Sequence, residues 1–429
     1  MTKTREFFSA FFSKRMMMVF LLGFSSGLPF LLVGGTLKIW LTRAGVDIST
    51  IGYFSWVGIA YSSKFVWAPL LDRWSFFGMG RRRSWMLITQ VALMIFIAIL
   101  GSLEPQTSLA AMAAISVIIA FFGATQDIAI DAFRREILKD SELGIGSSMN
   151  IYGFRIAMLV SGGVGIGLVG TLPGEGLAWS DLYYIMAALM TIGIIVTLMA
   201  PEPAIDPRVV ANRTFLQSVV DPFKQFLTRD RAVLILLFVF LFKLGDAMSA
   251  AMLNPFYVQM GYTNLDIGLI AKTFGLASSL VGIFFGGLIL FYLGTYRSLW
   301  IFGILQALST ASFAIITYTG PLKASLAFAV IFEDISAGMG SAAFLAFLAQ
   351  ITDRRFTATQ YAMLASIATL GRNFFSGFSG DMVKGLGWEW FFYICALTAI
   401  PGLLLIFPMK KITRQLEDEA LAINTLKPG

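Results

Sequence analysis

Histidine is absent from this 429-residue sequence, and cysteine occurs once, at Cys395. A single cysteine excludes a disulfide framework, and without histidine no Cys/His metal cluster can form. The G-x-S-x-G match at residues 23–27 is not a nucleophile elbow, because that hydrolase motif requires a histidine base. A proton relay in this chain must use carboxylates, lysines or tyrosines. The sequence therefore predicts neither a metal nor an organic cofactor.

Charged residues are also scarce, at 13% of the chain, against about 25% in soluble domains. Hydrophobic residues make up 57%, and the mean hydropathy is +0.78. The 40 phenylalanines and 41 glycines are typical of helices packed against each other in lipid. The net charge of +7 comes from basic residues in short loops between apolar runs. The predicted partner is therefore a lipid bilayer and not a nucleic acid.

Twelve apolar runs are long enough for membrane spans, which need about 20 residues each. We predict an all-α integral membrane protein with 12 transmembrane helices in two six-helix halves. The first run follows a basic N-terminus without a cleavage site, so it reads as an uncleaved helix. The predicted spans are 16–40, 49–71, 84–102, 109–133, 146–171, 180–200, 232–257, 265–292, 298–318, 323–351, 358–381 and 388–408.

The two halves repeat each other weakly. Gly45 and Gly52 match Gly261 and Gly268 at one common offset, and later matches follow in the same order. Such a parallel repeat is typical of secondary transporters. The predicted parts are an N-terminal bundle over 1–200, a connector with an amphipathic surface helix over 201–231, a C-terminal bundle over 232–410 and a tail over 411–429.

Basic residues also predict the orientation in the membrane. Most of the 32 lysines and arginines fall in the termini, the central connector and the loops on the same side as these. Only three, Arg43, Lys323 and Lys384, fall on the opposite side. Because loops rich in lysine and arginine stay in the cytoplasm, both termini are predicted to be cytoplasmic.

Six basic residues lie inside predicted spans, where ionisable groups usually face a cavity or each other. Lys64, Arg155 and Arg372 lie deep and are expected to line a cavity. The others have stems long enough to reach the interface instead; they are Lys38, Lys243 and Lys272. An acid in the seventh span, Asp246, lies near Lys243 and is equally compatible with a structural ion pair.

Asp127 and Asp131 lie four residues apart, on one face of a helix. Asp131 is within one turn of Arg134, which favours a salt-bridge or gating role. Asp127 lies one turn deeper, where a carboxylate with a basic neighbour can take up a proton on one side and release it on the other. Asp127 is therefore the first candidate for proton coupling. The other candidates are Asp131, Glu333 and Asp334.

The loop after the second span reads APLLDRWSFFGMGRRRSW and resembles the loop motif of the major facilitator superfamily. Asp72 and Arg73 match its acid-basic pair, and Arg81 and Arg82 belong to its basic end. Ala68 replaces the first glycine of the motif. The resemblance implies that the acid pairs across the two halves and holds the cytoplasmic side closed in one state of the transport cycle.

Four segments together, GFSSGLPF, GIAYSSKFVWAPLLDR, GRRRSW and ATQDIAIDAFRREIL, resemble the AmpG family of muropeptide permeases within that superfamily. The resemblance implies import of N-acetylglucosaminyl-1,6-anhydro-N-acetylmuramyl peptides from periplasm to cytoplasm, across the bacterial inner membrane. It also implies a cycle driven by the proton motive force, a monomer, and roles in peptidoglycan recycling and β-lactamase induction.

The resemblance further marks Ala124 and Gln126 of an A-x-Q element, and Gly27 in the glycine-rich first helix, which Pro29 is expected to help bend. A disaccharide carrying an acidic peptide needs amide, aromatic and basic partners. The predicted cargo contacts are Gln126, Lys64, Tyr61, Arg155, Asn150, Asn254, Arg372 and Asn373.

Three alternatives stay open at this point. The same fold could carry another cargo, such as an acetyl-CoA-like or siderophore-like molecule. The chain could be a membrane-embedded transferase, although its buried acids have basic neighbours and no metal ligands beside them. It could also be a receptor that binds turnover products without transporting them.

Overall fold

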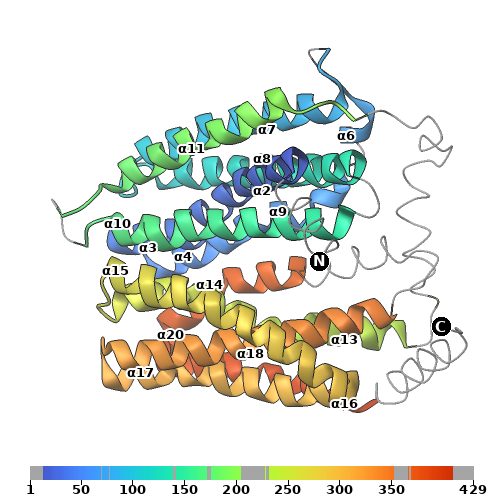
Figure 1. Cartoon of the computed structure of the whole chain (residues 1–429). Helices are drawn as coiled ribbons and strands as arrows, with labels where there is room; N and C mark the ends of the chain where they lie inside the picture. The colour runs from blue at the N-terminus through green and yellow to red at the C-terminus, as the bar shows by residue number, and fades with distance from the viewer. Residues whose placement is uncertain are drawn as a thin grey trace, which may run out of the picture. The chain divides into compact units, whose positions relative to one another are not determined.

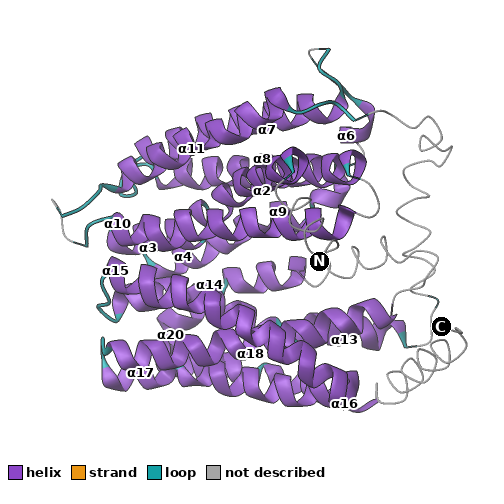
Figure 2. Ribbon diagram, viewed as in Figure 1, coloured by secondary structure: helices purple, strands orange, loops and turns teal. Residues whose placement is uncertain are grey.

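The computed structural model describes residues 13–68, 70–76, 78–138, 142–171, 175–203, 228, 231–351, 366 and 369–408. In this part of the chain the secondary structure is helical, apart from isolated bridges that Val169 makes with Gly176 and Leu177 (Figures 1 and 2). Nine of the described helical segments are long and apolar enough to cross a membrane. The predicted all-α membrane class is confirmed.

Differences between the predicted spans and these segments have local causes. The second predicted span consists of short pieces, including α4 (Ile48–Tyr53), α5 (Gly58–Ser62) and α6 (Leu70–Arg73). Two further predicted spans run together in Asn264–Thr319. Within that segment, Gly294 breaks the helix with a φ of 74°, which glycine adopts without steric cost. The predicted span 358–381 lies largely outside the described residues.

The chain divides into two compact units, described here one at a time. The first unit comprises Met1–Asp47, Trp56–Asn212 and Thr263–Leu269, and the second comprises Ile48–Ser55, Arg213–Tyr262 and Ile270–Gly429. Each unit thus contains one short segment from the other half of the sequence. The predicted boundaries at 200, 231 and 410 stay predictions, because most of the connector and the tail lie outside the described residues.

The long helices of the first unit begin with α2 (Lys14–Leu32) and α3 (Gly35–Arg43), which are separated by a break at residues 33–34. The others are α7 (Arg81–Ser102), α8 (Leu109–Ile137), α9 (Leu143–Met158) and α11 (Trp179–Met199). A π-helical turn, Leu159–Val164, and α10 (Gly165–Leu168) continue the path of α9.

Helices α2 and α9 approach each other closely because three glycines lie between them. A Cβ built on Gly27 would lie 2.5 Å from the carbonyl oxygen of Phe154, and one on Gly23 would lie 2.4 Å from that of Asn150. From the other side, a Cβ on Gly153 would lie 2.0 Å from the carbonyl oxygen of Phe20. Small residues at such crossings permit backbone contact between membrane helices. Gly27 thus packs α2 against α9.

Besides α4, the second unit contains α13 (Ala232–Leu241), α14 (Leu244–Gln259), α16 (Gly275–Ser312), α17 (Ala314–Thr319), α18 (Lys323–Ile351), α20 (Ser379–Leu397) and α21 (Ala399–Leu404). An aromatic cluster joins α14, α20 and the start of α17. In it the ring centroid of Phe392 lies 4.8 Å from that of Phe256 and 5.4 Å from that of Phe313. All three rings are buried.

The weak sequence repeat has a counterpart in backbone geometry. Gly45 and Gly261 both have positive φ, at 77° and 89°. In the second unit, Gly52 lies against the backbone of Gly380, and in the first unit Gly268 lies against that of Gly163. The matched glycines therefore serve the same turns and close approaches in both halves of the sequence.

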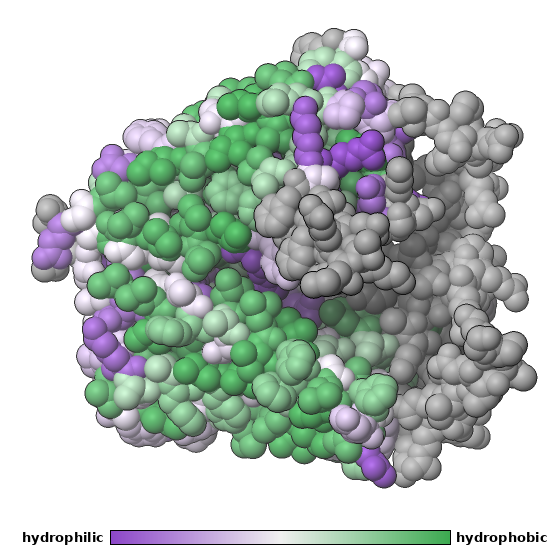
Figure 3. Space-filling view, viewed as in Figure 1, coloured by the Kyte–Doolittle hydropathy of each residue, from purple (hydrophilic) through white to green (hydrophobic). Residues whose placement is uncertain are grey.

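Apolar side chains cover much of the visible outer surface of the helices (Figure 3). On α16, the side chains of Phe284, Phe291 and Tyr292 are 68%, 83% and 75% exposed. A soluble protein rarely exposes contiguous large apolar side chains in this way. The surface fits a hydrocarbon environment.

Candidate functional site

Asp127 on α8 is a partly buried acid of the first unit. Its carboxylate accepts a hydrogen bond from Ser26 of α2. Its Oδ2 also lies 3.6 Å from Nζ of Lys64, in an ion pair that joins α8 to the broken second span. The side chain of Asp127 is 17% exposed and that of Lys64 is 38% exposed. Asp127 therefore has one cationic and one hydroxyl partner, each from a different element.

A cavity of about 500 Å³ lies beside this ion pair, within the first unit. This volume is in the range of small-molecule sites. Helices α2, α8 and α9 line it with Ser26, Phe30, Asp127, Ile130, Asp131, Asn150, Ile151, Phe154, Arg155 and Met158. Four of the predicted site residues therefore line one cavity; these are Asp127, Asp131, Asn150 and Arg155.

Two polar groups of the cavity lining have no partner among the described residues. One is the guanidinium of Arg155, which forms no ion pair or hydrogen bond there. The other is Oδ1 of Asn150, which is buried and accepts no hydrogen bond. A guanidinium matches the geometry of a carboxylate, and an amide oxygen accepts from an N–H or O–H. The guanidinium of Arg155 can thus bind an anionic group in the cavity.

Tyr61 and Gln126 lie next to this cavity. The ring of Tyr61 meets that of Phe30 edge-on at 5.5 Å, and its hydroxyl is buried without a partner in the described structure. Gln126 is fully buried and donates to Oγ of Ser25 at 2.9 Å, which ties α8 to α2. Ala124 is buried two residues earlier. The position of Gln126 suits helix packing behind the cavity; its predicted contact with cargo stays a prediction.

Asp131 is placed differently from Asp127. Its side chain is 52% exposed, and Oδ1 lies 3.1 Å from Nη2 of Arg134, one turn along α8. The predicted salt bridge is therefore present. An exposed pair of this kind contributes little to stability, and its carboxylate is open to solvent. Asp127 is the better shielded of the two acids.

The remaining predicted residues belong to the second unit. Asn254 is buried and accepts a hydrogen bond from Nζ of Lys272 at 2.6 Å. Arg372 donates to Oγ1 of Thr369 at 3.0 Å, and Asn373 follows it in the same helical stretch. Their part in cargo binding stays a prediction. Two acids on α18 complete the set: Glu333 and Asp334.

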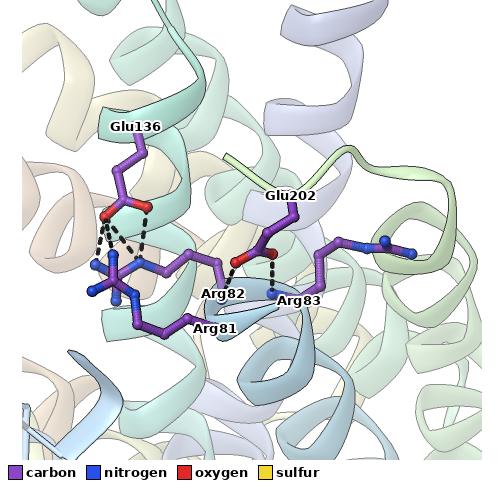
Figure 4. A network of polar contacts seen from close by, with 5 residues as sticks. All are labelled: Arg81, Arg82, Arg83, Glu136 and Glu202. Atoms are coloured by element: carbon purple, nitrogen blue, oxygen red, sulfur yellow. Dashed lines mark hydrogen bonds and ion pairs between the residues drawn. The ribbon is translucent and has the colours of Figure 1, made fainter. Parts of the chain in front are cut away.

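A second polar group of residues joins the ends of α7, α8 and α11 (Figure 4). Arg82 is buried, and its Nη2 donates to Oε1 of Glu136 at 2.5 Å while its Nε donates to both carboxylate oxygens at 3.1 Å. Arg81 also donates to Glu136, at 3.3 Å. We call these residues, with Arg83 and Glu202, the arginine–glutamate network.

Glu202, which follows α11, completes this network. Its carboxylate accepts from the backbone N–H of Arg82 at 2.8 Å and of Arg83 at 3.0 Å. A carboxylate there satisfies free donors of the first turn of α7 and complements the helix dipole. Arg83 in turn donates to the carbonyls of Thr197 and Leu198 near the end of α11. The two helix ends therefore cap each other.

The sequence motif implied a partner across the two halves for Asp72 and named no partner for Arg81 or Arg82. Their described partner is Glu136, within the same unit. Asp72 and Arg73 end helix α6, but their side chains lie outside the described part of the structure, so their pairing stays a prediction. Glu136 and Glu202 were missed because Glu136 lies in the last turn of α8 and Glu202 lies just after α11, and charged residues are common at the ends of membrane helices. Only a search for acids on the same side of the membrane as Arg81 and Arg82 would have found them.

We expect Glu136→Ala to lower the free energy of unfolding by about 2 kcal/mol, because the buried guanidinium of Arg82 loses its carboxylate partner. The melting temperature of the purified protein in detergent measures the effect. Glu104→Ala is the matched control, since Glu104 is exposed and its side chain forms no hydrogen bond or ion pair within the described residues. Equal melting temperatures for the two variants would contradict this role.

Comparisons with known proteins agree with this architecture. The sequence profile described as Major Facilitator Superfamily matches residues 19–372. An anhydromuropeptide permease of Escherichia coli K12 is 40% identical over 402 residues, which cover 94% of this chain and 81% of the relative. A putative transporter AmpG 4 of Rickettsia conorii is 31% identical, over 91% of this chain and 95% of the relative.

Solved structures show the same fold at low sequence identity. The nucleoside transporter NupG superposes with a TM-score of 0.71 at 17% identity, covering 92% of this chain and 99% of NupG. A D-xylose-proton symporter superposes with a TM-score of 0.68 at 14% identity, over 91% of this chain and 96% of that structure. At such identities the likeness establishes the fold and leaves the cargo open.

Proposed function

The chain belongs to the major facilitator superfamily, and from this premise we propose that it is a permease that imports anhydromuropeptides together with protons. Members of this superfamily are transporters and not enzymes, and they need no cofactor. The proposed cargo follows from the 40% identity to a relative that is named for it. The proposed energy source is the proton motive force, with Asp127 as the proton carrier.

One observation carries the proposal: an ion pair of Asp127 and Lys64 lies beside a cavity that also presents an unpaired Arg155. A peptide carboxylate of the cargo would pair with Arg155, and sugar hydroxyls and acetamides would bond with Asn150 and Tyr61. Asp127 can exchange its bond to Lys64 for a proton. These groups supply the anion binding and the proton binding that such a symporter requires.

The proposed setting is the inner membrane of a bacterium. Both termini lie in the cytoplasm, because the loops on their side carry most of the basic residues. The direction of transport is from periplasm to cytoplasm, the protein acts as a monomer, and its products enter cell-wall recycling and β-lactamase induction. The cycle alternates access to the cargo site between the two sides of the membrane.

Uptake into proteoliposomes tests this function. Purified protein is reconstituted, a pH gradient is imposed with the exterior acidic, and accumulation of radiolabelled anhydromuropeptide is followed. We expect accumulation above the external concentration that collapses when an uncoupler is added. Liposomes without protein serve as the control.

The same assay separates the alternatives. Accumulation of labelled acetyl-CoA or of a labelled iron–siderophore, without accumulation of muropeptide, would show that the fold assignment holds and the cargo is a different one. Binding of the labelled muropeptide without accumulation would instead identify a receptor. Accumulation that is unchanged by the uncoupler would remove proton coupling from the proposal.

A further inference from the structure

The second unit contains a buried polar cluster that the proposed cargo site does not use. Glu333 on α18 is 7% exposed, and its Oε2 accepts hydrogen bonds from Oγ of Ser309 at 2.7 Å and from Oγ1 of Thr310 at 3.3 Å. Both hydroxyls belong to α16, which runs beside α18 (Figure 1). Two donors on one oxygen hold this carboxyl group firmly in the core of the unit.

Asp246, in the first turn of α14, is the second acid of the cluster. Its carboxyl group is within hydrogen-bonding distance of that of Glu333. Its Oδ2 also lies 3.5 Å from Nζ of Lys243, which is 5% exposed. Lys243 has two weaker contacts on α18, with the carbonyl oxygen of Ala337 at 3.5 Å and with Oγ of Ser341 at 3.4 Å.

Two ionised carboxylates cannot hydrogen-bond to each other, because each offers only acceptors. A direct bond between Asp246 and Glu333 therefore requires a proton on one of them. A structural ion pair of Asp246 with Lys243 alone, which the sequence also allowed, does not account for the contact with Glu333. We propose that Asp246 and Glu333 share one proton and form a proton-binding site of the transport cycle in the second unit.

Other titratable groups surround the pair. Arg372 is within electrostatic range of Asp246, and Cys395 is within range of both acids. Tyr257 is within electrostatic range of Glu333. Asp334 is within electrostatic range of both Lys272 and Asp246. Lys243 and Arg372 are thus cations that act on Asp246. An anionic group of the cargo that bound near Arg372 would change the electrostatic potential at the shared proton. Cargo binding and proton binding would then be coupled.

Infrared spectroscopy of the protein in lipid nanodiscs tests the shared proton without any cargo. Wild type is expected to show the C=O stretching band of a protonated carboxylic acid at neutral pH. Glu333→Gln and Asp246→Asn are each expected to remove the same band, because a single carboxylate beside Lys243 has no partner to share a proton with. A band that persists at full intensity in either variant would overturn the proposal.

Two further variants make this experiment decisive. Glu389→Gln is the matched control, since Glu389 is partly exposed in the same unit, with Tyr318 as its hydrogen-bond donor; it should leave the band unchanged. Ser309→Ala keeps both acids and removes one donor to Glu333, so the band should shift in frequency. If the acid variants do not fold, an unshifted band in Ser309→Ala overturns the proposal.

The role of the Asp246–Glu333 pair in the transport cycle rests on the proposed function, and it is tested by a separate transport assay. In proteoliposomes, Glu333→Gln should reduce uptake driven by a pH gradient much more than it reduces exchange of labelled for unlabelled muropeptide, whereas Glu389→Gln should behave as wild type. Equal reduction of both activities would overturn the coupling role. Failure of wild type to transport muropeptide would refute the proposed cargo, and the infrared result would still decide the shared proton.

Discussion

Asp127→Asn is expected to abolish uphill accumulation of the cargo. A pH gradient of one unit supplies about 1.4 kcal/mol per proton, which supports about tenfold accumulation for a symporter that moves one proton. Asparagine keeps the size of the side chain and can still bond with Ser26, but it cannot take up a proton at any pH. The ratio of internal to external cargo should therefore fall to about one.

The reason lies in the surroundings of this carboxylate. Asp127 is largely shielded, with Lys64 3.6 Å away as its ion-pair partner, and it shares a cavity lining with Arg155. Protonation would release Lys64 from the pair. An ion pair that is made in one state and broken in another biases a two-state equilibrium between conformations. Loss of the negative charge in Asp127→Asn fixes the site permanently in its neutral form.

Asp131→Asn is the matched control for Asp127→Asn. Asp131 lines the same cavity, one turn along α8, but it is half exposed and paired with Arg134. We expect Asp131→Asn to keep at least half of the wild-type accumulation. The measurement is radiolabelled uptake in proteoliposomes, with the amount of reconstituted protein matched. Wild-type accumulation by Asp127→Asn would remove this residue from the coupling mechanism.

Sequence patterns were sufficient for the fold class and for the helix that carries Asp127. Apolar runs and the scarcity of charge predicted a helical membrane protein because lipid leaves no other way to satisfy the backbone. The charges at Lys64, Asp127 and Arg155 were conspicuous because they lie within long apolar runs, and they do lie close to one cavity. Burial of a charge is costly, so such residues are informative even in a single sequence.

Contacts between distant residues could not be predicted in the same way. The pairing of Arg82 with Glu136 joins helices whose facing sides depend on the packing of the whole bundle. The contact between Asp246 and Glu333 also depends on how α14 and α18 pack, and local sequence indicated only the neighbour Lys243. Glycine motifs were ambiguous too, because the same residue permits either a bend or a close approach.

Gly153→Leu is expected to have the largest effect on stability of any single substitution considered. Even the first carbon of a side chain at Gly153 would lie 2.0 Å from the carbonyl oxygen of Phe20 and 2.8 Å from the backbone nitrogen of Phe24. Backbone atoms of α2 cannot rotate away as a side chain would. The two helices must separate, and overpacking of this kind costs about 3 kcal/mol or more.

The same displacement reaches the cavity. Ser26 and Phe30 on α2 face Asn150 and Arg155 on α9 across the cavity lining, and Gly153 lies between the last two along the helix. A wider spacing of α2 and α9 would lengthen the hydrogen bond from Ser26 to Asp127. It would also move Arg155 away from Ser26 and Phe30 on the α2 side of the cavity. Gly153→Ala, the milder change, should therefore weaken muropeptide uptake even where the protein still folds.

Gly287→Ala provides the matched control, and it is expected to act in the opposite direction. Gly287 lies in helix α16, and a Cβ there would meet no atom within 4 Å. Alanine favours a helix over glycine by about 1 kcal/mol, so Gly287→Ala should leave the melting temperature in detergent unchanged or raise it, while Gly153→Ala lowers it. If both alanine variants melted at the same temperature, close backbone packing of α2 on α9 would not be what stabilises the first unit.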